Sequence, residues 1–125
     1  MSAEKLAAAS GVYHIGIAIF HLAFWRLFGW HTALRKLDRV NAAIMQVLNL
    51  RLTWLFLVFA TIALVYPGEL VATPIGKGLL TGITLFWLMR AVEQIIFFGL
   101  RQRASQAFFL VCVAGAALHS AMLLA

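Results

Sequence analysis

Charged side chains are scarce in this sequence, which has 10 Lys and Arg residues and 4 Asp and Glu residues among 125. Hydrophobic residues make up 64% of the chain, whereas a soluble domain is about 45–50% apolar and about 25% charged. The composition therefore excludes an ordinary soluble domain and indicates an all-α integral membrane protein. At this length we expect a single membrane domain over residues 1–125.

Cysteine is nearly absent, since Cys112 is the only one in the chain. A single cysteine excludes an intrachain disulfide and every metal motif that is built from several cysteines. Cys112 lies within a hydrophobic run, so we interpret it as a small, buried packing residue.

The signatures of several enzyme classes are also missing. There is no G-x-S-x-G, no His-Glu-x-x-His and no Walker loop. No aspartate lies within an apolar segment, which excludes an intramembrane aspartyl dyad. Ser10 and Ser120 lie close to the level expected for two histidines, but the absence of an acidic partner disfavours a Ser–His nucleophile. Whether the protein is an enzyme is left open by the sequence.

Long apolar segments make up most of the sequence. A membrane-spanning helix needs about 20 mainly apolar residues. We predict four transmembrane helices that form an antiparallel bundle, with spans at about 8–28, 43–66, 79–100 and 106–124.

Local signals place the ends of these helices. Asp38 or Asn41 is expected to cap the second helix, and Pro67 cannot continue it. Residues 67–78 hold both prolines and three glycines, which predicts a structured loop with turns. Ser105 is expected to cap the last helix.

Basic residues predict the orientation of the chain. The connections 29–42 and 101–105 carry more Lys and Arg than the opposite side, which has Lys5 and Lys77. By the positive-inside rule we expect both connections to be cytoplasmic and both termini to lie outside. The net charge of +6 is then a topology signal, so the expected partner is a lipid bilayer, that of the bacterial inner (plasma) membrane, and not nucleic acid.

A polar face interrupts the third predicted span. Arg90, Glu93 and Gln94 follow helical spacing and share one side of the helix. Ionisable groups at membrane depth cost about 2.5–3.5 kcal/mol each, so they normally face protein, water or a ligand. Asn49 and Arg51 are expected at the same depth.

This inner polar layer has two interpretations. In one, Glu93 pairs with Arg90 or Arg51, the amides bond across helices, and the layer only holds the bundle together. In the other, the surplus positive charge binds an anionic or carbonyl-bearing ligand, with His21 one layer away as a proton carrier.

Histidines define an outer layer. His14 and His119 are each about 9 Å from the outer end of their helices at 1.5 Å per residue, and they would face each other if the first and last spans were neighbours. They are then either hydrogen-bonded structural residues or ligands of a haem or transition metal. His21 lies roughly 10 Å from His14 along the helix, too far to share one metal ion.

These patterns leave three hypotheses. The first is a membrane binding or redox module that holds a cofactor or hydrophobic ligand, with His14, His119 and His21 as candidate ligands. The second is a small proton- or ion-coupled transporter or channel with Glu93 as the coupling carboxylate. The third is a structural subunit of a larger membrane complex. A bundle this small has few buried positions, so a homo-oligomer or a partner membrane subunit is expected.

Overall fold

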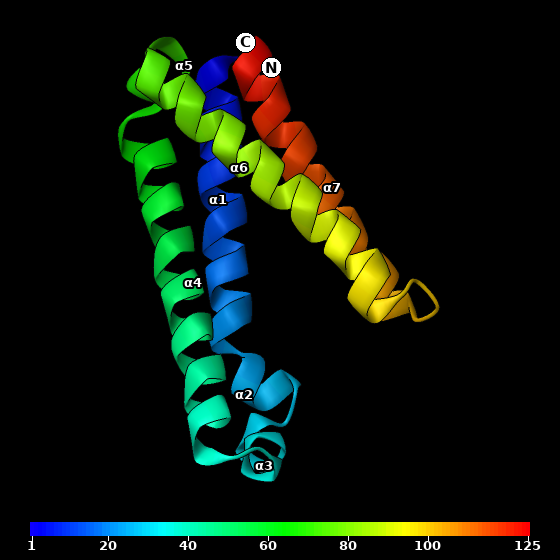
Figure 1. Cartoon of the computed structure of the whole chain (residues 1–125). Coiled ribbons are helices and arrows are strands. Elements are labelled where there is room, and N and C mark those ends of the chain that lie inside the picture. Colours follow the sequence, from blue (N-terminus) through cyan, green and yellow to red (C-terminus); the bar gives the residue numbers. More distant parts are fainter. The chain divides into compact units, whose positions relative to one another are not determined.

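A computed structural model describes all residues 1–125, and every regular element in it is a helix (Figure 1). Four helices are long and apolar enough to cross a membrane. They are α1 (Ala3–Leu22), α4 (Arg39–Val65), α6 (Pro74–Glu93) with its π-helical continuation η2 (Gln94–Phe98), and α7 (Arg103–Leu124). The all-helical class and the presence of four candidate spans are confirmed.

The chain divides into two compact units. One comprises residues 11–62, and the other comprises residues 1–10 with residues 63–125. The boundaries fall inside α1 and α4, so each of these helices contributes residues to both units.

In the unit of residues 11–62, α1 lies beside α4 (Figure 1). Three short helices connect them: α2 (Phe24–Leu27), α3 (Trp30–Ala33) and the 3-10 helix η1 (Leu34–Lys36). The first predicted span ran as one helix to residue 28, whereas α1 ends at Leu22. The helix is interrupted at Ala23, whose φ of −82° and ψ of −1° depart from the ideal α-helical values of about −63° and −42°. Gly29, with its φ of +59°, reverses the chain before α3.

The start of α4 is fixed by Asp38. Its carboxylate Oδ2 accepts a hydrogen bond from the backbone N–H of Asn41 at 3.3 Å, and Oδ1 accepts from the Asn41 side chain. These bonds lower the pKa of Asp38 below its ordinary value, because they favour the ionised carboxylate. Asp38 is therefore the N-cap, one of the two residues predicted for that role. The helix ends at Val65, just before Pro67, as predicted.

In the other unit, the predicted loop over 67–78 is mostly helical. Helix α5 (Pro67–Ala72) is followed almost directly by α6. Each proline stands at the start of its helix, where the missing N–H is not needed. Thr73 caps α6 by accepting from the N–H of Gly76 at 3.0 Å. A Cβ on Gly76 would meet the carbonyl oxygen of Leu70 at 2.3 Å, so only glycine fits this close approach.

Helices α6 and α7 form a hairpin (Figure 1). The turn begins at Gly99, whose φ of +73° favours glycine. Helix α7 begins at Arg103, three residues before the predicted span, and its N-cap residue, Gln102, forms no side-chain cap. The prediction that Ser105 caps α7 is wrong, because its hydroxyl donates to the carbonyl of Gly99 instead. Cys112 is fully buried, as predicted.

Candidate functional site

Ser10 of α1 and His119 of α7 meet in the buried interior of their unit. The Ser10 Oγ lies 2.8 Å from Nε2 of His119, and the His119 Nδ1 lies 2.6 Å from the carbonyl oxygen of Gly115. A carbonyl can only accept, so Nδ1 carries a hydrogen. In a neutral ring Nε2 is then the acceptor and the Ser10 hydroxyl donates to it. The ring of His119 is thereby fixed in one tautomer and one orientation.

His21 is oriented in the same way by Asn49 of α4. The His21 Nδ1 lies 2.7 Å from Oδ1 of Asn49, whose amide donates to the backbone carbonyl of His21 at 2.9 Å. The amide oxygen can only accept, so Nδ1 again carries the hydrogen and Nε2 is the basic nitrogen of the neutral ring. Asn49 is buried and His21 is half-buried.

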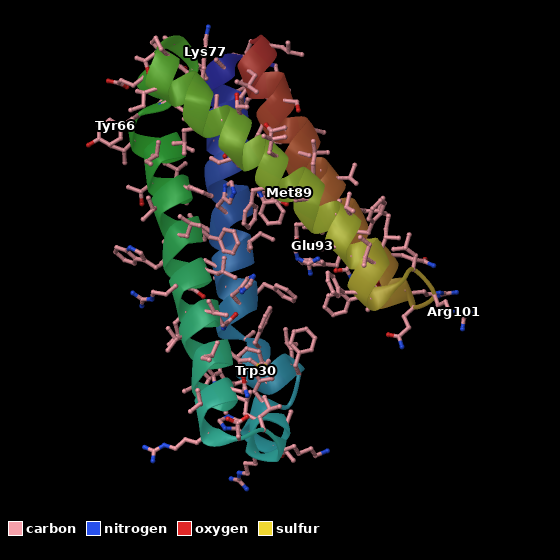
Figure 2. All side chains as sticks on the ribbon, viewed as in Figure 1. Trp30, Tyr66, Lys77, Met89, Glu93 and Arg101 are labelled. Atoms are coloured by element: carbon pink, nitrogen blue, oxygen red, sulfur yellow. The ribbon has the colours of Figure 1, made fainter.

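Aromatic rings surround His21. The ring of Phe24 stacks on it at 4.5 Å between centroids, and the ring of Phe56 lies at 5.1 Å. Beyond them lies the ring of Trp30 (Figure 2). Its centroid is 5.5 Å from that of Phe24 and 5.1 Å from that of Trp25. His21 is therefore held by one amide within an aromatic environment at the end of the α1–α4 pair.

His14 belongs to the unit of residues 11–62, and its side chain is fully buried. Its ring lies 5.3 Å from that of Phe59 in an edge-on arrangement and 6.0 Å from that of Phe56 in a stacked one. Phe56 thus contacts both His14 and His21. His14 and His119 belong to different units, and the expectation that they face each other stays a prediction.

The polar groups of the third candidate span form a chain of hydrogen bonds. Arg90 Nη2 donates to Oε1 of Gln94 at 3.0 Å, and Gln94 Nε2 donates to the Ser105 hydroxyl at 2.8 Å. That hydroxyl donates in turn to the carbonyl of Gly99. The rings of Phe98 and Phe108 lie 5.5 and 5.0 Å from the guanidinium carbon. Nη1 of Arg90 is buried and has no hydrogen-bond acceptor.

The backbone at this cluster is unusual. Gln94–Phe98 form a π-helix, and the N–H of Gly99 donates to the carbonyl of Gln94 at 3.0 Å. Short π-helical segments are rare and are found frequently at functional sites.

Two residues predicted to lie in the polar interior have exposed side chains instead. Arg51 is exposed on α4. Glu93 is exposed on α6 (Figure 2). On a helix consecutive residues are about 100° apart, so burial of Gln94 turns the neighbouring Glu93 away. Arg90 therefore bonds to the amide of Gln94 and not to the carboxylate of Glu93.

No three His, Cys, Asp or Glu side chains come together in an arrangement that could hold a metal ion. A metal or haem bound here would thus depend on one or two imidazoles. His21 and His119 meet one requirement of such ligands, because a hydrogen bond from Nδ1 to an oxygen acceptor orients the ring for ligation by Nε2.

Sequence reasoning did not find Ser105, Phe98 or Phe108 as members of the Arg90 cluster. Ser105 was assigned to a helix cap, and the two phenylalanines were indistinguishable from lipid-facing aromatics. The available signal was the short turn after Gly99, which brings residues of α6 and α7 near the turn opposite one another.

Comparison of the chain with protein-family models, with curated proteins and with solved structures finds no match.

Proposed function

We propose that the protein is an integral membrane module that holds a haem, a metal or a hydrophobic ligand between its helices. Four apolar helices with widely exposed aliphatic side chains support insertion into a bilayer. Exposed examples on α1 and α4 are Val12 at 68% and Leu48 at 58%, which water would disfavour but lipid would not. The predicted orientation, with both termini outside and the connections 29–42 and 101–105 in the cytoplasm, belongs to this proposal.

One observation carries the binding role. His21 and His119 both direct Nδ1–H to an oxygen acceptor, so that Nε2 is the basic atom in each neutral ring. Nε2 in this tautomer is the atom that ligates a metal or accepts a proton. His119 would exchange its hydrogen bond from Ser10 for a ligand, whereas the aromatic surroundings of His21 suit a planar cofactor. Haem or a transition metal would supply redox chemistry if it is bound.

The test is an absorption spectrum of the detergent-purified protein, recorded before and after addition of hemin. The metal content of the same sample is measured before hemin is added. We expect a Soret band or stoichiometric metal that is lost in His21→Ala or His119→Ala. The exposed His31 provides a matched control, and His31→Ala should leave the signal unchanged. A flat spectrum without metal, before and after hemin, would contradict cofactor binding and leave transport or a structural role.

A second candidate, a subunit of a homo-oligomer or of a larger membrane complex, is favoured by Glu93. Its carboxylate is exposed beside Met89 of α6, which is 60% exposed, and Ile96 of η2, which is 68% exposed. In a bilayer an exposed carboxylate costs about 2.5–3.5 kcal/mol, and a cationic side chain of a neighbouring subunit would offset this. Native mass spectrometry from detergent should show an assembly that Glu93→Leu weakens or rearranges. A monomer with or without Glu93 would exclude this candidate.

A further inference from the structure

One buried donor atom of the Arg90 cluster, Nη1 of the guanidinium, has no acceptor within the chain. Nη2 is used by Gln94, while Nη1 is buried without an acceptor. Buried polar groups are nearly always hydrogen-bonded, so an exception requires a partner from outside the chain or a functional reason. The missing group must be an acceptor, because a guanidinium can only donate.

The missing acceptor should also be anionic. The guanidinium is always charged, and its one side-chain acceptor, Gln94, is a neutral amide. Glu93 is exposed and does not neutralise it. The flanking rings of Phe98 and Phe108 contribute only cation–π attraction. A partly buried cation without a counterion is costly, which favours an oxyanion over a neutral carbonyl as the ligand.

The guanidinium is held in position before any ligand arrives. Gln94 is fixed by Ser105, and Ser105 is fixed by the carbonyl of Gly99. These bonds tie Arg90 to the turn of the α6–α7 hairpin. The side chain of Phe98, whose ring lies 5.5 Å from the guanidinium carbon, is 69% exposed, so the cluster lies at the surface of the hairpin.

The cluster lies toward the end of the candidate span Pro74–Phe98, which would be near the lipid headgroups of a bilayer that this helix crosses. Arg90 reaches toward Gln94, and Gln94 is five residues from Gly99, which is about 7–8 Å of helix at 1.5 Å per residue. Arg101 is exposed at the same turn (Figure 2), and Arg103 is exposed at the start of α7, so both add positive potential. An anionic group at the membrane surface would meet all three arginines on its approach.

We propose that Arg90, with Gln94 and Ser105 as positioning residues, binds the phosphate oxyanion of an acidic phospholipid. Free phosphate has the same chemistry, and the test below separates the two sources. The inference rests on the membrane insertion in the proposed function, but not on the histidine-bound cofactor.

The experiment measures the thermal stability of the detergent-purified full chain during titration with phosphatidylglycerol, phosphatidylcholine or sodium phosphate. We expect phosphatidylglycerol to stabilise the wild type more than phosphatidylcholine does, because the quaternary ammonium of phosphatidylcholine offsets the charge of the same phosphate group and is repelled by the arginines. Arg90→Gln should weaken the response about tenfold or more. Lys77→Gln removes one positive charge from an exposed position toward the other end of α6 (Figure 2) and should respond like the wild type.

Equal stabilisation of Arg90→Gln and wild type by phosphatidylglycerol would overturn the proposal, as would no response of the wild type to it. A response to sodium phosphate that matches that to phosphatidylglycerol would overturn the lipid assignment and make free phosphate the ligand. If Arg90→Gln does not fold, Arg90→Lys and Gln94→Leu provide the same comparison, because both disturb the donor geometry and keep the charge. His21→Ala should lose a cofactor signal and keep the lipid response, so failure of the two proposals is distinguishable.

Discussion

The two units solve the problem of buried polar groups differently. In the α1–α4 pair, Asn49 both accepts from and donates to His21, so the network closes on itself. In the α6–α7 hairpin, each hydrogen bond is donated toward the next residue, from Arg90 through Gln94 and Ser105 to Gly99. The buried Nη1 of Arg90 has no acceptor in this chain of bonds. A closed network fixes the register of two helices and orients a ring. An open network, in which one buried donor has no acceptor, can bind a ligand. The two kinds of network are distinguished by whether every buried donor has an acceptor.

Breaking the closed network should have the largest effect. Asn49→Leu removes both bonds between α1 and α4 and leaves the His21 Nδ1–H and carbonyl without these partners. Interhelical hydrogen bonds in membranes average about 0.6 kcal/mol and reach about 1.7 kcal/mol, so we expect a loss of about 1–3 kcal/mol in the free energy of unfolding. Denaturation in mixed detergent micelles measures it.

Thr61→Val on the same helix is the control for Asn49→Leu. The Thr61 hydroxyl is exposed and bonds only to the carbonyl of Leu57, one turn earlier, so its loss should change the free energy of unfolding by less than about 0.5 kcal/mol. Equal destabilisation by the two substitutions would show that the His21–Asn49 bonds do not hold the two helices together.

Two neighbouring residues sharpen the contrast in the open network. Gln94→Leu removes the acceptor of Arg90 and the donor to Ser105, and we expect a loss of about 1 kcal/mol. Glu93→Gln in the monomer should change the free energy of unfolding by less than about 0.5 kcal/mol, because that side chain is exposed. The same denaturation assay measures both. A larger effect at Glu93 than at Gln94 would contradict the described burial.

The smallest effect is expected at Asp38, outside both networks. Hydrogen bonds from Asn41 lower the folded-state pKa of Asp38 below the unfolded value, close to 3.8. Its contribution to stability is therefore present above the unfolded pKa and is lost as the pH falls through the folded pKa. Asp38→Asn keeps a capping oxygen but cannot ionise. The melting temperature of the variant should thus fall less than that of the wild type between about pH 6 and about pH 2.5.

An identical acid dependence in wild type and Asp38→Asn would contradict this assignment. The comparison of the two proteins is needed because other acids titrate in the same range, and only the difference between the two curves reports on Asp38.

Local chemistry made some of the fold predictable. The Asp38 cap and the end of α4 before Pro67 follow from groups a few residues apart, and both are confirmed. Thr73 followed by Pro74 is an equally local start signal for α6, but the high proline and glycine content of the segment favoured a loop. Ser105 could not be assigned correctly, because its partners, Gly99 and Gln94, come from across the hairpin turn.

The sequence predicted which polar residues belong to the candidate site, but it did not predict which of them bond to each other. Helical spacing allows Arg90 to reach Glu93 three residues on or Gln94 four residues on. One interpretation of the sequence paired Glu93 with Arg90 or Arg51, whereas in the structure Arg90 bonds to the amide of Gln94. The choice depends on how the helix is rotated against α7, and that rotation places Gln94 opposite Ser105.

The sequence by itself determined that this chain forms long apolar helices with a few polar side chains, because helix length, hydropathy and end signals are local properties. The tertiary structure alone decided which polar groups meet. Ser10 with His119, Asn49 with His21, and Gln94 with Ser105 are each joined across helices or across a turn. A hydrogen bond requires its two atoms to be within about 3 Å of each other, and only packing sets the rotation of each helix that closely.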